Sequence, residues 1–270
     1  MEDLSSYIWC INSQREECCY RTFFAQPLLE CVKILPMDSQ LNLFGKKHNE
    51  QSAKVLTEEK VVPTKTEVQI KTKYNSLEEA KSDALKCKKC SLCSGRTNVV
   101  FSDGNEKAKI MVIGEGPGEN EDLQGLPFVG RAGQLLDKIF ASVDLNRKEH
   151  IYICNIVKCR PPNNRAPLEE EANACRDYLE AQICYIDPKI IILAGAVAVK
   201  GVLKVKDVKI TKIRGQWIDS KDPLLAERKI MPIFHPSYLL RHEWNKAPDS
   251  PKGQMWKDVQ EIRKAFDLLN

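Results

Sequence analysis

Cysteines are the residues of this chain whose spacing most directly suggests chemistry. Cys87 and Cys90 form a Cys-x-x-Cys pair, and such a pair holds a metal centre only with further ligands from elsewhere in the chain. Cys159, on a polar loop, and Cys175, about two turns into the next expected helix, are the candidate partners, with Cys93 as a nearby competitor. Four cysteines suit either zinc or an iron–sulfur cluster. Spacing does not decide between them, but a structural zinc ion is the first interpretation because a pair of this kind recurs in structural zinc sites.

A second candidate for chemistry is a glycine-rich, acidic loop at residues 114–122, which reads Gly-Glu-Gly-Pro-Gly-Glu-Asn-Glu-Asp. It follows an apolar run, 109–113, that is typical of a buried parallel strand. Open α/β sheets place their ligands in such loops, where glycine lets the backbone approach a ligand closely. The glycine spacing matches neither a dinucleotide-binding fingerprint nor a phosphate-binding loop. The loop therefore indicates a ligand site of another kind.

The elements that must position these residues alternate along the chain. Apolar runs predict strands at 109–114, 151–157, 190–195 and 230–234. Helical patterns predict helices at 76–85, 130–145, 168–185, 196–204, from 237, and at 252–269. Strands that alternate with helices favour a three-layer α/β/α fold with a central, mostly parallel, four-stranded sheet.

Bulk composition is that of a globular protein. The chain has 270 residues, of which 43% are hydrophobic and 29% charged, with a net charge of +4. This charge permits nucleic acid as a partner without requiring it. No apolar run is long enough to span a bilayer and no signal peptide is visible, so we expect a cytoplasmic protein that acts as a monomer away from membranes.

The residues before the folded part form a separate region. We expect an N-terminal extension and flexible linker over 1–75 and the folded domain over 76–270. Residues 40–44, Gln-Leu-Asn-Leu-Phe, resemble the short peptide by which bacterial DNA-processing proteins bind the sliding clamp. Leu41, Leu43 and Phe44 would fill an apolar pocket and Gln40 would anchor one end. Nothing in residues 1–35 indicates a role.

Taken in order, several blocks of the chain resemble the family 4 uracil-DNA glycosylases, the iron–sulfur type of bacteria and archaea. The blocks are residues 87–90, 96–100, 114–122, 127–136, 152–165, 210–217 and 234–241. They span roughly residues 76 to 269, and so many blocks in one order are far more specific than any single motif. The resemblance implies the fold of these glycosylases and hydrolysis of the N-glycosidic bond of deoxyuridine in DNA, an early step of base excision repair.

The resemblance also implies a cofactor. It assigns Cys87, Cys90, Cys159 and Cys175 to a [4Fe–4S] cluster, and this replaces zinc as the expected metal centre. The cluster would brace the N-terminal part of the domain against the loop after the second strand. Cys93 falls outside the ligand set.

The same resemblance assigns the site residues. Phe128 would stack on a uracil that has left the helix, an extrusion that costs a few kcal/mol. Asn155 would read the polar edge of uracil, because its amide both donates and accepts. His235 would donate to the uracil oxygen as negative charge develops there. Glu115 would orient or activate the water, and Glu121 would exclude the methyl group of thymine, although the division between these glutamates is open. The backbone of Gly116 and Pro117 would complete the pocket.

Contacts to DNA, in single or double strands, follow from the same comparison. Leu239 or Leu240 would wedge into the base stack beside the extruded nucleotide. The phosphate contacts would come from Arg131, Lys212 and Arg241, which position the DNA without reading its sequence.

Two alternatives stay open. One is a related enzyme that becomes covalently trapped on its product, although the loop at 159–165 lacks the histidine-containing insertion of that branch. The other is an iron–sulfur DNA-binding module of the replication machinery without turnover, which Glu115, Asn155 and His235 disfavour. Whether other deaminated bases are accepted, and whether the cluster has a redox role, is left open by the sequence.

Overall fold

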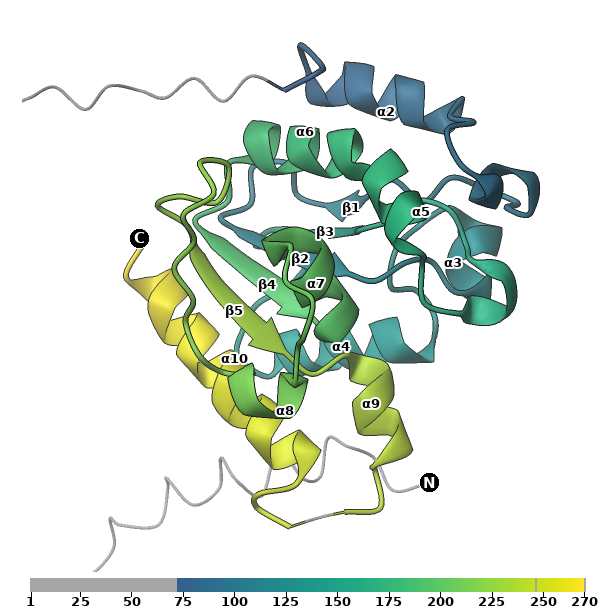
Figure 1. The fold of residues 1–270 in the computed structure, drawn as a ribbon. Coiled ribbons are helices and arrows are strands. Elements are labelled where there is room, and N and C mark those ends of the chain that lie inside the picture. Colours follow the sequence, from purple (N-terminus) through teal and green to yellow (C-terminus); the bar gives the residue numbers. More distant parts are fainter. Residues whose placement is uncertain (1–71, 246, 270) are drawn as a thin grey trace, which may run out of the picture. The chain divides into compact units, whose positions relative to one another are not determined.

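A computed structural model describes residues 72–245 and 247–269 of the chain (Figure 1). Its centre is a five-stranded sheet with strands in the order β1-β3-β2-β4-β5. The strands are β1 Asp103–Gly104, β2 Ile110–Gly114, β3 Ile151–Asn155, β4 Ile190–Ala194 and β5 Lys229–Ile233. All neighbouring strands run parallel except β1, which pairs with β3 in the antiparallel sense. The α/β class with a mostly parallel sheet is confirmed.

Helices lie on both faces of the sheet (Figure 1). The α-helices are α2 Leu77–Leu85, α3 Glu119–Gln124, α4 Arg131–Ala141, α5 Glu169–Ala174, α6 Arg176–Ile186, α7 Ala196–Leu203, α8 Ile210–Ile213, α9 Pro236–Arg241 and α10 Pro251–Asp267. Two short 3-10 helices, η2 Ser91–Ser94 and η3 Pro162–Asn164, lie in connecting segments.

Alternation along the strands divides the core into two layers. In β2, Met111 and Ile113 pack with α2, α6 and α7, whereas Ile110 and Val112 pack with α4, α9 and α10. Successive side chains of a strand point to opposite faces, so a fully apolar run such as Ile-Met-Val-Ile serves both layers. This double burial explains why these strands lack the apolar–polar alternation of a half-exposed sheet.

The parallel register brings the carboxyl ends of the strands to one edge. Gly114 of β2 pairs with Asn155 of β3, and Ala194 of β4 pairs with Ile233 of β5. After β2 the chain builds β3 on one side of it, and later β4 on the other. Such a reversal of strand order opens a crevice at the carboxyl edge, where open α/β sheets bind ligands.

Three local features differ from the sequence-based expectation. The segment Asp103–Gly104, which was not expected to be a strand, forms the edge strand β1, so the sheet has five strands instead of four. The acidic loop contains a helical turn and a half, α3. The single helix expected at 168–185 is two helices, α5 and α6, that meet at Cys175. There the Cys175 amide is shared between the carbonyls of Glu171 and Ala172, a bifurcated bond typical of helix ends.

Among the described residues, no helix combines the length and the apolar character needed to cross a membrane.

Candidate active site

The carboxyl edge of the sheet holds a cavity of about 610 Å³, within the range of small-molecule sites. It is lined by all seven residues that the sequence selects for catalysis and base binding: Glu115, Gly116, Pro117, Glu121, Phe128, Asn155 and His235. They come from the segment between β2 and α4, which includes α3, from the end of β3 and from the N-cap of α9. Arg241, one of the expected DNA contacts, also lines the cavity.

Asn155 lines the cavity from the last position of β3. Its side chain is only 2% exposed, and its Oδ1 has no hydrogen-bond partner within the described structure. A buried, unpaired carbonyl costs about 1–3 kcal/mol, so its retention points to a ligand that supplies the missing donor. Gly114 lies directly opposite, and a Cβ there would collide with Asn155 Oδ1 and with the Phe128 ring. The absence of a side chain at Gly114 therefore keeps the amide and the ring together.

His235 enters the cavity as the N-cap residue of α9. Its Nδ1 accepts the Ser237 amide at 3.2 Å and lies 2.8 Å from Ser237 Oγ. Burial, and then the charge of Arg241, lower the pKa of His235 to about 4 against an opposing contribution from Glu121. The imidazole is therefore neutral at pH 7. Because Nδ1 accepts, the proton resides on Nε2, which is left as a donor.

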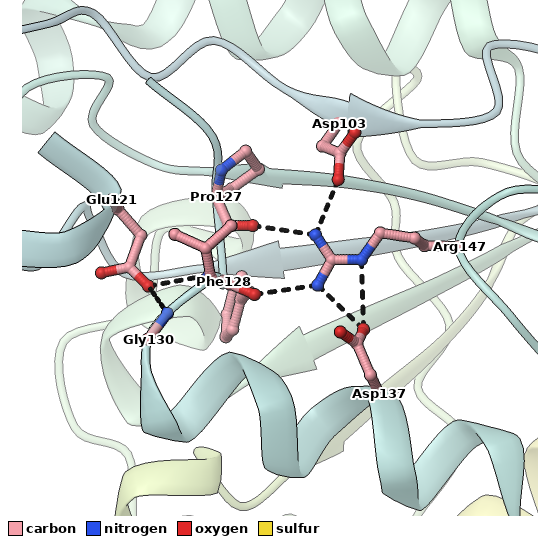
Figure 2. A network of polar contacts seen from close by, with 8 residues as sticks. Asp103, Glu121, Pro127, Phe128, Gly130, Asp137 and Arg147 are labelled. Carbon is pink, nitrogen blue, oxygen red and sulfur yellow. Dashed lines mark hydrogen bonds and ion pairs between the residues drawn. The ribbon is translucent and has the colours of Figure 1, made fainter. Parts of the chain in front are cut away.

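The two glutamates of the loop have different surroundings. Within the described residues the Glu115 carboxylate accepts no hydrogen bond, and burial raises its pKa. The Glu121 carboxylate accepts three backbone amides, from Gly118 at 3.1 Å, Val129 at 2.9 Å and Gly130 at 2.7 Å. Figure 2 shows the bond from Gly130. Glu115 is thus available to a water molecule, whereas Glu121 joins the loop before α3 to the loop before α4.

Phe128 forms an apolar wall of the cavity. It is 6% exposed, and its ring centroid lies 5.8 Å from that of His235 with the planes tilted by 34°. Its φ of 54° falls in the left-handed region, which bulky residues rarely adopt. Backbone strain of this kind persists only where the surroundings over-determine it, and it concentrates at functional sites.

Comparison with known proteins accounts for this arrangement. Residues 101–260 match the uracil DNA glycosylase superfamily. The chain belongs to the uracil DNA glycosylase superfamily. It is 47% identical over 175 residues to a type-4 uracil-DNA glycosylase of Thermotoga maritima, a match covering 65% of this chain and 88% of that protein. The type-4 enzyme of Sulfurisphaera tokodaii is 42% identical over 172 residues, covering 62% and 76%. That of Archaeoglobus fulgidus is 40% identical over 168 residues, covering 61% and 83%. The resemblance to the type-4 glycosylases is confirmed.

In this glycosylase domain, four cysteines converge from three segments. Cys87 and Cys90 lie between α2 and η2, Cys159 follows β3, and Cys175 lies at the joint of α5 and α6. Burial raises the pKa of Cys159, a hydrogen bond from Arg96 Nη1 at 3.2 Å opposes this, and Cys90 and Cys87 raise it again. Burial likewise raises the pKa of Cys175 to about 11, with Cys159 and Cys90 adding to the effect. Electrostatic effects therefore link Cys159 to each of the other three cysteines.

These four cysteines are the donor set that the resemblance assigns to a [4Fe–4S] cluster. In the described ranges, no three His, Cys, Asp or Glu side chains are arranged around a single metal ion. Four thiols without imidazole or carboxylate are nevertheless the ligands that [4Fe–4S] clusters use. All four are free cysteines that pack on one core layer. Their chemistry and convergence fit the cluster.

The glycosylase's expected DNA contacts are distributed less uniformly. Arg131, Lys212 and Arg241 are exposed, but only Arg241 lines the cavity. Leu239 is 1% exposed and packs in the core with α4 and α10, so it is not available as a wedge. Leu240, next in the chain, is partly exposed and remains the candidate. The clamp-like peptide with Gln40, Leu41, Leu43 and Phe44 lies outside the described residues and stays a prediction.

Several residues of the site were not found from the sequence. Ser237 holds the ring of His235, and Gly195 lies beneath it, where a Cβ would come within 3.0 Å of His235 Cβ. Lys158 is 1% exposed and donates at 2.6 Å to the Asn155 carbonyl and to Gln182 Oε1. The one sequence feature that could have indicated the contacts of Lys158 is the position of a lysine directly after the apolar run of β3.

Proposed function

We propose that the protein is a uracil-DNA glycosylase that hydrolyses the bond between uracil and deoxyribose in DNA, releasing uracil and leaving an abasic site. The observation that carries the proposal is the unpaired Oδ1 of Asn155 inside a cavity lined by Phe128, His235 and Glu115. Uracil carries an N3–H donor beside its O4 acceptor. A carboxamide held at its edge complements this pair with one acceptor and one donor.

The proposed reaction begins with the base out of the helix. The C1′–N1 bond breaks, its electron pair passes to uracil, and positive charge develops on the sugar. His235, neutral and donating through Nε2, stabilises the uracil anion at its carbonyl oxygen. One preorganised donor of this kind is worth roughly 3–4 kcal/mol when the transition state carries the charge.

Glu115 takes the part of the carboxylate that faces the sugar cation and the attacking water. Water adds to C1′, and its proton passes to Glu115 or to solvent. We assign Glu121 chiefly to holding the loop around Phe128. Because Glu121 also lines the cavity, we keep it as the residue that excludes a methyl group on the base. Phe128 would stack on the flat base.

We propose that Cys87, Cys90, Cys159 and Cys175 hold a [4Fe–4S] cluster. When bound it supplies covalent cross-links between the start of the domain, the loop after β3 and the α5–α6 joint, and no step of the hydrolysis uses it. We further propose that Arg131, Lys212 and Arg241 contact phosphates, that Leu240 enters the base stack, and that residues 76–270 form the catalytic domain after an N-terminal extension.

An oligonucleotide with one uracil tests the function. After incubation with the full chain and treatment with alkali, we expect cleavage at the uracil position and none at a matched thymine or cytosine. A stable protein–DNA adduct in place of free abasic DNA would indicate the covalently trapped type. Binding without any abasic product would indicate a DNA-binding module and overturn the proposal.

A further inference from the structure

The segment that presents Phe128 is held in an uncommon backbone conformation. Phe128 has a φ of 54° although it is a bulky residue. The turn also packs closely on the first turn of α4, because a Cβ at Gly133 would collide with the Phe128 backbone. In a free chain this φ would be disfavoured, since only glycine and a few small polar residues adopt it readily. Other groups must therefore stabilise it.

Arg147, on the turn before β3, contacts this segment from one side (Figure 2). Its Nη1 donates to the Pro127 carbonyl at 3.1 Å, and its Nη2 donates to the Phe128 carbonyl at 2.8 Å. Two carboxylates fix the guanidinium: Asp103 of β1 accepts from Nη1 at 2.7 Å, and Asp137 of α4 accepts from Nη2 at 2.8 Å and Nε at 3.1 Å. Arginine presents its donors in one rigid plane, so fixing the guanidinium fixes both carbonyls.

Glu121 contacts the same segment from the other side. It accepts the amides of Val129 and Gly130 (Figure 2). The peptide plane before Phe128 is thus held through the Pro127 carbonyl, and the plane after it through the Phe128 carbonyl and the Val129 amide. Because peptide groups are planar, holding both planes determines φ and ψ of the residue between them. The direction of the Phe128 ring follows from these two angles.

We propose that Arg147 is a positioning residue of the reaction, which sets the Phe128 ring for stacking on the extruded base. Arg147 does not line the cavity, so it acts through Phe128 and not on the substrate. This rests on the proposed function. Asp103 and Asp137 contribute to this positioning, because they orient the guanidinium between the sheet edge and α4.

The chain offers a matched control in Arg263. Its Nη1 donates to two turn carbonyls, Val143 and Asp144, each at 3.1 Å, and its Nε pairs with Asp267 at 2.9 Å. This turn does not line the cavity. Arg147→Met should lower kcat/KM on a single-stranded uracil oligonucleotide by about hundredfold, as small misplacements of an active-site group do. Arg263→Met should stay within about twofold, as substitutions away from the site usually do.

A double-mutant cycle with Phe128→Ala separates positioning from general destabilisation. If Arg147 acts through the ring, Arg147→Met should cost less than about threefold when the ring is already absent, because the two changes then share one effect. Arg147→Lys keeps the charge but cannot hold both carbonyls. It is measured in the same double-mutant cycle and replaces Arg147→Met if the methionine variant does not fold. Equal losses with and without the Phe128 ring, or no loss in either, would overturn the proposal. Failure of the parent protein to release uracil would instead contradict the proposed function.

Discussion

Two walls of the cavity can be compared. The stacking wall comprises Phe128 with its flanking backbone and Glu121, and Arg147 supports it from outside the cavity. There, carbonyls and amides are bonded to charged side chains. The reading wall comprises Asn155 and His235, and there Asn155 Oδ1 is left unpaired. Hydrogen bonds on the stacking wall are used to hold a conformation. On the reading wall the bonding capacity is kept for a ligand.

Substitutions in the two walls should therefore have different effects on folding and on chemistry. A change in the stacking wall removes bonds that the folded protein already makes, so stability and activity should fall together. A change in the reading wall removes groups whose partners arrive only with substrate. There, activity should fall while stability is kept or even rises, as is common for strained active sites.

The largest effect is expected on the reading wall. Asn155→Ala should lower kcat/KM for uracil excision by about a thousandfold, because it removes both groups that face the base edge. The free energy of unfolding should change by less than about 1 kcal/mol, since the change also removes an unpaired buried carbonyl. Single-turnover kinetics and urea unfolding of the same preparation measure the two quantities. A large loss of stability would show that Asn155 belongs with the structural residues.

Glu115→Gln should lower activity and raise stability. Activity should fall by about hundredfold or more, as for other general bases. The raised pKa of Glu115 means that its ionised form is less favourable in the folded than in the unfolded state, so its contribution to stability is lost as pH rises through that pKa. At pH 7.5 the glutamine variant should therefore have the higher unfolding midpoint. A lower midpoint would mean that the carboxylate has partners in the folded state.

His235 should make stability depend on pH below neutrality. Its folded pKa of about 4 lies below the usual 6.5, so its contribution is fully present above pH 6.5 and is lost as pH falls toward 4. Between pH 7.5 and 5.0 the parent should lose about 2 kcal/mol more than His235→Gln, given about 1.4 kcal/mol per pKa unit. An equal loss of stability in both proteins between these two pH values would contradict a neutral imidazole in the folded protein.

Glu121→Gln gives the smallest effect on activity and tests the stacking wall. One carboxylate now serves three backbone amides, and a carboxamide oxygen accepts more weakly. Stability should fall by about 2 kcal/mol, the usual value for hydrogen bonds to a charged group. Activity should fall by about tenfold through loosening of Phe128. An activity loss without any loss of stability would place Glu121 on the reading wall.

The sequence predicts the sheet and the edge where the site forms, for a simple reason. The runs before Gly114 and around Ile153 and Ile192 are apolar at every position, which parallel strands buried on both faces require. Residues that follow directly, such as Glu115 and His235, must then meet at one edge. These conclusions depend only on local pattern and on the rule that parallel strands end together.

The features of the site that the sequence does not predict depend on contacts between residues far apart in the chain. No local signal shows that Arg147 bonds to the Phe128 backbone, or that Phe128 has a positive φ. The two leucines of α9 are equivalent in the sequence, and only packing against α4 and α10 buries Leu239 while Leu240 stays partly exposed. The break at Cys175 likewise lies within a segment of continuous helical pattern.

We infer that Asn155 Oδ1 is kept for the N3–H of uracil. Two ligands of equal size test it: 1-methyluracil retains N3–H and carries its methyl where the sugar attaches, whereas 3-methyluracil lacks N3–H. Binding of each to the full chain is measured as inhibition of uracil release from a single-stranded oligonucleotide. We predict that 3-methyluracil binds at least about a hundredfold more weakly, as expected when a buried polar group is left unpaired. Equal inhibition by both would contradict the claim.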